Sequence, residues 1–257
     1  MSRPPLFLSY GMPKSGSTLA FEITRTMLEL AGIPQHKIGN DLTDPKTQIN
    51  FVSRLDGKAL TGLLEETSGR SAIPVAIKTH SGLFPKVGKA LESGRIIGHA
   101  VCRDPRDMAL SMLDAAREGR AWGQDQKKQL QTVADTENRL RKSIEQFRLW
   151  AEIPGVMPIH YERLAFDTET VASEIAEHLR ISVDIRKAVE IATGTKFTQF
   201  NQGKSQRWKT EMDPADAKRL EGMFSNYIRT YCSEIPSAPK TRKPVKGFLA
   251  KWLAKIR

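Results

Sequence analysis

The sequence has 257 residues, of which 39% are hydrophobic and 27% are charged, and its formal net charge is +11. This length supports one hydrophobic core, and we find neither a secretory signal nor a run of roughly 20 apolar residues that could span a membrane. The positive charge favours polyanionic partners, and two distant cysteines suggest neither a disulfide framework nor a metal site. We therefore expect a cytoplasmic protein.

The positive charge is concentrated at the C-terminal end. Residues 240–257 contain seven Lys or Arg and no Asp or Glu, so removing these seven charges from +11 leaves only +4 for residues 1–239. The sequence thus predicts a globular domain over residues 1–239 and a basic tail over residues 240–257.

Strand and helix patterns alternate along the domain. Residues 6–10 are apolar and β-prone, and after a glycine-containing loop apolar residues recur at helical spacing up to Gly32. Further strands are predicted at 73–78, 95–102 and 156–161, and further helices from about Arg106, at 133–151, 168–179 and 183–192, and from Pro214. Because parallel strands need crossover connections, this alternation predicts a P-loop-like three-layer α/β/α fold with a central parallel sheet.

Two polar segments interrupt this pattern. Residues 114–132 are expected to form a mobile excursion that could act as a lid, and residues 193–210 are expected to be irregular.

The loop after the first strand, Gly11-Met12-Pro13-Lys14-Ser15-Gly16-Ser17-Thr18, has the composition of an anion-binding site. The positive end of a helix and its unpaired N–H groups lie at such a place. Gly16 lets the backbone approach a phosphate, Lys14 supplies a mobile charge, and the hydroxyls are donors. An ATP-type P-loop has its lysine directly after the second glycine, whereas Lys14 precedes Gly16 by two residues. A Gly-Ser turn that only caps the helix is the simpler alternative.

The segment Pro13-Lys14-Ser15-Gly16-Ser17-Thr18 resembles the 5'-phosphosulfate loop, Pro-Lys-Ser-Gly-Thr-Thr, of sulfotransferases that use 3'-phosphoadenosine 5'-phosphosulfate (PAPS). Three later segments resemble further motifs of this family in the family's order: Lys78-Thr79-His80, Arg103 with Ser111, and Tyr161-Glu162-Arg163-Leu164. The resemblance covers about residues 6–210. It implies PAPS as co-substrate, 3'-phosphoadenosine 5'-phosphate (PAP) as product, and no required metal.

The resemblance also implies a role for each matching residue. His80 would be the general base of an in-line transfer, and Lys14 and Lys78 would stabilise the negative charge on the leaving phosphate and the sulfuryl oxygens. The nucleotide would be bound at its 5' end by Lys14, Ser15, Gly16, Ser17 and Thr18, at its 3'-phosphate by Arg103 and Ser111, and near its adenine by Tyr161.

At two places the sequence departs from the family pattern, and there the family's residue roles cannot be assigned directly. Leu19 stands where the family has a tryptophan that stacks on adenine. Toward the C-terminus, residues 201–209 keep one glycine and the Trp-Lys ending of the family's Arg-Lys-Gly-x-x-Gly-Asp-Trp-Lys segment, but the cations are displaced. Gly203, Lys204 and Arg207 are therefore assigned to the 3'-phosphate by approximate position only.

Several assignments have a structural alternative. Arg103 and Asp107 could form an ion pair at a helix start, and Tyr161 could be a core aromatic residue with its hydroxyl satisfied. Trp150 and Trp208 are predicted to pack in the domain rather than to contact the nucleotide.

The tail ends in apolar residues that fall on one helical face, with Lys251 and Lys255 away from it. This pattern predicts a basic amphipathic helix. Two alternatives stay open, because such a helix suits peripheral contact with an anionic membrane and also suits packing on the domain.

The motifs together predict a sulfotransferase that moves the sulfuryl group of PAPS to a hydroxyl or amine of a small-molecule, lipid or glycan acceptor. Residues around 40–70 and 114–132 are expected to shape the acceptor pocket, but they carry no signature of the acceptor. Two other functions stay open: a P-loop nucleotide kinase or NTPase, and a non-catalytic basic module that binds membrane or nucleic acid. The four ordered motifs favour the enzyme and give no reason to expect nucleic acid as a partner.

Overall fold

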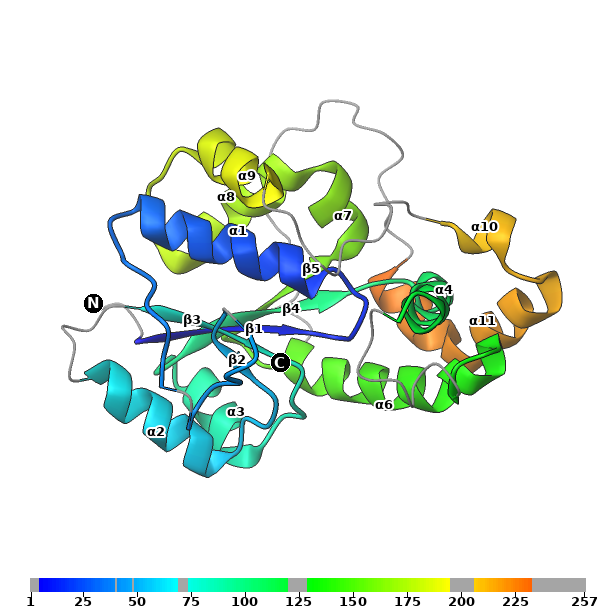
Figure 1. Cartoon of the computed structure of the whole chain (residues 1–257), viewed down its shortest axis with the longest axis horizontal. Coiled ribbons are helices and arrows are strands. Elements are labelled where there is room, and N and C mark those ends of the chain that lie inside the picture. The colour runs from blue at the N-terminus through cyan, green and yellow to red at the C-terminus, as the bar shows by residue number, and fades with distance from the viewer. Residues whose placement is uncertain are drawn as a thin grey trace.

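Five parallel strands form the central sheet of the computed structural model (Figure 1). They are β1 (Leu6–Gly11), β2 (Phe51–Val52), β3 (Val75–Thr79), β4 (Ile97–Cys102) and β5 (Val156–His160). Their order across the sheet is β2-β3-β1-β4-β5, and every neighbouring pair runs parallel. The structure describes residues 5–39, 41–47, 49–68, 74–119, 129–194 and 206–232.

Helices cover both faces of this sheet (Figure 1). One face carries α1 (Ser17–Leu30), α7 (Tyr161–Phe166), α8 (Thr168–Leu179) and α9 (Ile185–Gly194). The other carries α2 (Gly57–Ser68), α3 (Pro85–Glu92) and α6 (Val133–Ala151). Packed against α6 is α4 (Pro105–Arg117), which contacts α10 (Trp208–Glu211) and α11 (Pro214–Tyr231). The predicted three-layer fold with a central parallel sheet is confirmed.

Side-chain alternation along β1 explains the two layers. Leu6, Leu8 and Tyr10 pack in the core beneath α2, α3 and α6, whereas Phe7 packs in the core beneath α1, α8 and α9. Successive side chains of a strand point to opposite faces of a sheet, and every residue of β1 is buried. A strand buried on both faces belongs in the middle of a parallel sheet, where β1 lies.

Some elements differ from the sequence predictions. The pattern does not indicate β2, because two residues are too few to show a period, and it does not indicate α2 or α3. Tyr161, predicted to end a strand, is instead the first residue of α7. The predicted excursion over 114–132 is wrong at its start, because α4 continues to Arg117. Its polar residues there reflect the exposed end of a helix, and residues 120–128 lie outside the described residues.

The carboxyl ends of all five strands lie at one edge of the sheet, since the strands are parallel. The chain passes from β1 to β2 and β3 on one side of β1, and then to β4 and β5 on its other side. In sheets of this kind, ligands bind outside the carboxyl ends of the strands, where the strand order switches direction. This edge holds the loop after β1 and the residues that follow β3, β4 and β5.

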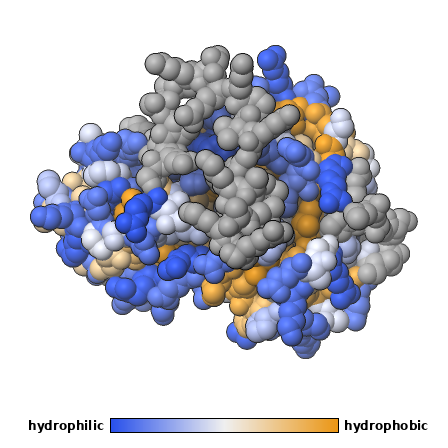
Figure 2. All heavy atoms as spheres, turned by 180° about the vertical axis from the view of Figure 1, so that it is seen from behind, coloured by the Kyte–Doolittle hydropathy of each residue, from blue (hydrophilic) through white to orange (hydrophobic). Residues whose placement is uncertain are grey.

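Seen from behind, the described surface is mostly hydrophilic, with apolar residues gathered in patches (Figure 2). In the part of the chain that the structure describes, no helix has both the length and the apolar character needed to cross a membrane. The basic tail, with its predicted amphipathic helix and the domain boundary at 239, lies outside the described residues. Both stay predictions.

Candidate active site

The loop between β1 and α1 has the backbone of an anion-binding turn. Lys14 (φ 68°) and Gly16 (φ 86°) adopt left-handed conformations, and Gly16 is the N-cap of α1. Ser15 donates its N–H and its hydroxyl to the Met12 carbonyl, at 3.1 and 2.7 Å. Since the first turn of α1 contains no acidic residue, no carboxylate of that turn opposes an anion at the positive helix end. Turns of this kind form anion-binding concavities from successive N–H groups.

Tyr161, at the start of α7, packs against this loop. A Cβ atom added to Gly16 would lie only 2.5 Å from Cδ2 of Tyr161. The left-handed backbone and the close approach of the ring therefore both require glycine at position 16. Tyr161 is 8% exposed, so it is a buried aromatic residue that also forms a wall of the loop.

Lys78 reaches the loop from the end of β3. Its Nζ donates to Oγ1 of Thr18 at 2.6 Å, and its side chain is buried beneath α1. Burial lowers the pKa of Lys78 to about 8, with Lys14 acting in the same direction and Glu22 opposing it. A buried ammonium of this kind is poised to bind an anion, because an anion would replace the solvation that burial has removed.

His80 also contacts the loop, two residues beyond Lys78. Its Nδ1 lies 2.5 Å from the Gly11 carbonyl oxygen. Because a carbonyl oxygen can only accept, Nδ1 carries the proton and Nε2 has the free lone pair. Burial and the charge of Lys78 lower the pKa of His80 to about 4, so the imidazole is neutral at pH 7. A neutral imidazole with a free Nε2 can accept a proton.

Arg103, directly after β4, closes the loop from the other side of β1. Its Nη1 donates to the Lys14 carbonyl at 3.2 Å, and its guanidinium lies 3.9 Å from the centre of the Tyr161 ring. Nη2 lies 3.7 Å from Oδ2 of Asp107, so the ion pair considered as a structural alternative is present as well. The guanidinium of Arg103 therefore contacts the loop and pairs with Asp107 at the same time.

Three of the four sequence motifs thus contact the fourth, the loop of residues 11–18. Lys78, His80 and Arg103 each donate a hydrogen bond to that loop, and Tyr161 packs on Gly16. These residues are far apart in the sequence, and the parallel sheet brings them to one edge. The structure therefore places most of the predicted site residues together.

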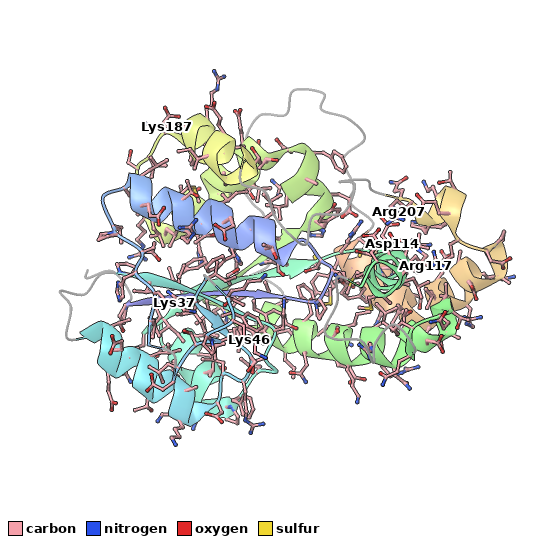
Figure 3. All side chains as sticks on the ribbon, in the orientation of Figure 1. Lys37, Lys46, Asp114, Arg117, Lys187 and Arg207 are labelled. Atoms are coloured by element: carbon pink, nitrogen blue, oxygen red, sulfur yellow. The ribbon has the colours of Figure 1, made fainter. Side chains whose placement is uncertain are left out.

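The remaining predicted residues are placed differently. Ser111 is buried in α4, two turns beyond the start of that helix. Arg207 is buried and engaged by two carboxylates, Asp114 at 2.8 Å and Glu211 at 2.6 Å. Figure 3 shows Arg207 and Asp114 directed toward one another beside α4. Gly203 and Lys204 lie outside the described residues.

Both tryptophans named as packing residues make packing contacts. Trp150 is fully buried, stacks on Tyr10 at 4.7 Å and donates its indole N–H to the Ser81 carbonyl at 3.2 Å. Trp208 packs against the core, and the guanidinium of Arg106 lies 3.6 Å from the centre of its ring.

Three residues near the site were given no role by the sequence, and two of them, Tyr227 and Phe51, belong to no motif. The Tyr227 hydroxyl, from α11, bonds both the N–H and the carbonyl of Arg103, which fixes the backbone there. The Phe51 ring meets the His80 imidazole edge to face at 5.5 Å. The carboxyl of Glu162 is buried, which raises its pKa to about 7. A helical tyrosine and a lone phenylalanine give no signal of such roles, whereas Glu162 could have been noticed beside Tyr161.

Among the described residues, no group of three or more His, Cys, Asp or Glu side chains is placed to hold a metal ion. Of the basic residues that the structure describes, Lys14, Lys78 and Arg103 lie in or against the loop.

Solved structures with the same fold include two proteins that were crystallised with PAP. Mouse sulfotransferase SULT7A1 complexed with PAP aligns with a TM-score of 0.58 at 20% identity, over 87% of this chain and 84% of that chain. Retinol dehydratase in complex with retinol and PAP aligns with a TM-score of 0.55 at 16% identity, over 95% and 84%. Its complex with androsterone and the inactive cofactor PAP gives 0.54 at 16% identity, over the same shares. At these identities the likeness shows the fold.

No match was found among curated protein sequences. The sulfotransferase domain model, in contrast, matches residues 4–231, which include every motif of the site. This match confirms the resemblance seen in the sequence, and the chain belongs to the sulfotransferase domain family.

Proposed function

We propose that the protein transfers the sulfuryl group of PAPS to a hydroxyl or amine of an acceptor by in-line displacement, with His80 as general base. The observation that carries this proposal is the convergence on one loop of Lys78, His80 and Arg103, from the ends of two different strands. A structural loop needs no neutral imidazole beside two buried or half-buried cations. An enzyme that moves an anionic group with removal of a proton needs both.

The transfer requires one bond to form and one to break. The acceptor atom forms a bond to sulfur while the bond from sulfur to the bridging oxygen of the 5'-phosphate breaks, and the electron pair of that bond leaves with PAP. The acceptor proton passes to Nε2 of His80. Nδ1 is held by the Gly11 carbonyl at 2.5 Å, which fixes the orientation of the ring.

Binding of the nucleotide would also adjust the base. The pKa of His80 is low because of burial and the neighbouring charges of Lys78 and Lys14. Phosphate groups placed beside these lysines would offset their charge, so the pKa of His80 would rise toward neutrality in the complex. The imidazole would then accept a proton more readily at the moment when the donor is present.

The other residues are assigned to the parts of the nucleotide that each would bind. Lys14, Lys78 and the N–H groups of the loop would stabilise charge on the leaving phosphate, together with Ser15, Ser17 and Thr18. Arg103 and Ser111 would bind the 3'-phosphate, with Gly203, Lys204 and Arg207 as further candidates, and Tyr161 would lie near the adenine. The PAP found in the structures of SULT7A1 and retinol dehydratase supports this choice of nucleotide.

The acceptor and the location in the cell are proposals of the same kind. Retinol and androsterone occupy retinol dehydratase in its solved complexes, which supports a small-molecule acceptor here rather than a macromolecule. We propose a cytoplasmic enzyme, with peripheral membrane contact through the tail as a separate hypothesis. Flotation with anionic liposomes tests that contact, because equal binding with and without residues 240–257 would remove the reason for it.

Calorimetry with PAP and with ATP·Mg²⁺ tests the nucleotide. We expect binding of PAP and little binding of ATP, because Arg103 lies where a 3'-phosphate could be recognised. Preference for ATP would favour the kinase alternative, and preference for long polyanions would favour the basic module. A second experiment supplies PAPS and cell extract and searches by mass spectrometry for products that gain one sulfuryl group. PAP binding without any such product would leave the protein a nucleotide-binding module and refute the proposed transfer.

A further inference from the structure

The ends of β4 and β5 bring a buried carboxyl close to Arg103. Cys102 pairs with His160 in the register of these two strands. Arg103 and Tyr161 directly follow this pair and lie side by side, with the guanidinium 3.9 Å from the centre of the ring. Glu162 comes next, in the first turn of α7, and only 5% of its surface is exposed. Of the charges that act on its carboxyl, that of Arg103 is the strongest.

The surroundings of the Glu162 carboxyl do not favour its ionised form. Its Oε1 is buried and has no hydrogen-bond partner in the part of the chain that the structure describes. A carboxylate has two oxygens that accept hydrogen bonds, and leaving one without a donor away from water is costly. Burial raises the pKa of Glu162 to about 7, although the N–H of Glu162 itself bonds to the carboxyl and lowers it. The neutral acid and the carboxylate are thus nearly balanced at pH 7.

Arg103 interacts with more than one carboxyl. Its Nη2 lies 3.7 Å from Oδ2 of Asp107, an oxygen that is buried and accepts no hydrogen bond from the described residues. Asp104 also acts on Glu162, but it is bound by Arg106 at 2.6 Å. The buried charged side chains at the starts of α4 and α7 are therefore two arginines and three carboxyls. With Glu162 ionised they carry one negative charge in excess, and with Glu162 neutral they balance.

Other titratable groups surround this cluster. Burial raises the pKa values of the neighbouring thiols and phenols, which are neutral at pH 7: Cys102, Cys232, Tyr161 and Tyr227. The charged and titratable neighbours are the pairs Arg106–Glu221 and Arg163–Glu174, Arg207 with Asp114 and Glu211, and the half-buried Lys14 and His160. Most of these groups are at least partly exposed, so solvent screens them more than it screens Arg103, Asp107 and Glu162.

Binding of a phosphate at Arg103 would shift Glu162 toward its neutral form. A nearby negative charge raises the pKa of a carboxyl, and solvent weakens this effect little between buried groups. A phosphate monoester carries about two negative charges near pH 7, so it would act in the same direction as Asp107 and Asp104 do in the free protein. By thermodynamic reciprocity, protonation of Glu162 then strengthens binding of the phosphate by the same factor.

We propose that Glu162 is a positioning residue for the 3'-phosphate of PAPS and PAP, and that it takes up a proton from solvent when this phosphate binds. With Glu162 neutral, one buried carboxylate fewer competes with the phosphate for the charge of Arg103. The proton forms the O–H bond of the acid and returns to solvent when PAP leaves. This inference rests on the proposed function, in which Arg103 binds the 3'-phosphate. It concerns nucleotide binding, so kcat/KM for the acceptor at saturating PAPS does not report it.

Calorimetry in two buffers measures the proton directly. PAP is titrated into the full-length protein at pH 7.5 in HEPES and in Tris, whose ionisation enthalpies differ, and AMP is titrated in the same way. AMP shares the 5'-phosphate and the adenine, so proton uptake by Lys78 and His80 occurs with both nucleotides. We expect PAP to take up about 0.7 proton more than AMP, since a carboxyl with a pKa of about 7 is about three-quarters ionised at pH 7.5. Equal uptake would refute the proposal.

Glu162→Gln keeps the shape of the neutral acid and cannot ionise. At pH 8.5 this variant should bind PAP about tenfold more tightly than the native protein does, because it needs no proton. A purely structural role would not give tighter binding on substitution, and binding no tighter than native at this pH would overturn the proposal. The comparison of PAP with AMP uses the native protein, so it decides the matter even if the variant does not fold.

Glu174→Gln in α8 is the matched control. Its carboxylate pairs with Arg163 of α7 and is 43% exposed, so the same change of charge is made near the same helix but at the surface. This variant should bind PAP as the native protein does at pH 8.5. A gain equal to that of Glu162→Gln would contradict a local effect of the buried carboxyl.

The same titrations separate this inference from the proposed function. If the native protein binds PAP no better than AMP at pH 7, the proposed role of Arg103 fails and this inference falls with it. If PAP is preferred and the preference is the same at pH 7 and at pH 8.5, only the inference about Glu162 is wrong.

Discussion

The loop of residues 11–18 and a cavity of about 380 Å³ beside β2, lined by Phe51 and by residues of the segments 41–44 and 52–59, are built in different ways. The loop gathers Lys14, Lys78 and Arg103 around a tight backbone turn, with Lys78 and Arg103 buried. The charged residues that line the cavity are exposed or half-buried and of both signs, and Lys37 lies beside one of its aspartates, Asp44. Buried cations at a rigid turn suit an anion of fixed shape, whereas a half-exposed lining of mixed charge suits a group that differs between substrates.

This difference teaches that the two substrates make separate demands on the chain. The donor needs charge at defined atoms, so single substitutions around the loop should have large effects. The acceptor needs a shaped and weakly charged surface, so single substitutions there should have small effects. His80 bonds to the loop and also contacts Phe51, which lines the cavity.

The largest effect is expected where the two regions meet. His80→Ala should lower the rate of sulfuryl transfer by about 10² to 10⁴, because the general base is lost, while PAP affinity is retained. His80→Asn is the matched control for structure, since its amide can still donate to the Gly11 carbonyl but has no basic nitrogen. Single-turnover kinetics and calorimetry check both values. A native rate in either variant would remove His80 from the chemistry.

The next effect concerns the backbone of the loop. Gly16→Ala should lower the free energy of unfolding by about 3 kcal/mol, since the new Cβ both strains the left-handed backbone and meets Tyr161. Gly94→Ala is the control, because Gly94 also has a positive φ but nothing lies within 4 Å of its added Cβ. That control should lose only about 1 kcal/mol. Equal losses in urea denaturation would show that the contact with Tyr161 contributes nothing.

Arg103 distinguishes the two ends of the nucleotide. Arg103→Ala should weaken PAP binding by about 2 kcal/mol, or about 30-fold, because one charge-assisted contact to the 3'-phosphate is lost. Binding of AMP, which has no 3'-phosphate, should change little. Calorimetry with both nucleotides makes the comparison, and a parallel loss for AMP would assign Arg103 to the loop alone.

The pH dependence of kcat/KM distinguishes the proposed base, His80, from the cation Lys78. In the free enzyme, His80 becomes the neutral, competent form above its pKa of about 4, and Lys78 loses its charge above its pKa of about 8. We therefore expect kcat/KM to rise through about pH 4, stay level, and fall above about pH 8. In Lys78→Arg the upper fall should disappear, since a guanidinium stays protonated. An unchanged upper limb would mean that another group titrates there.

The smallest effect is expected at Arg207. Asp114 and Glu211 already neutralise its charge, so Arg207→Gln should weaken PAP binding by only about threefold. AMP binding should not change. An identical response of PAP and AMP would give Arg207 a structural role between α4 and α10 in place of the proposed contact to the 3'-phosphate.

Much of the donor side could be predicted from the sequence. Pro13 to Thr18 is a contiguous segment whose residue types are set by local backbone needs. Lys78 lies near the end of a recognisable apolar strand, and His80 and Arg103 each directly follow one. The alternation of strands and helices was enough to predict the parallel sheet, and a parallel sheet brings the ends of its strands together. Parts of the same region could not be predicted, such as Tyr227, whose helix packs beside Arg103 only in the folded chain.

By itself, the sequence determined the fold class, the loop of residues 11–18 and the residue types that we propose for binding the donor, because each depends on a short local pattern. Only the tertiary structure decided that Phe51 lies against His80, that Arg207 is shared by Asp114 and Glu211, and that charged residues of both signs line a cavity beside β2. These contacts join residues whose spacing in the chain follows no period. Packing across the sheet edge, rather than local propensity, brings them together.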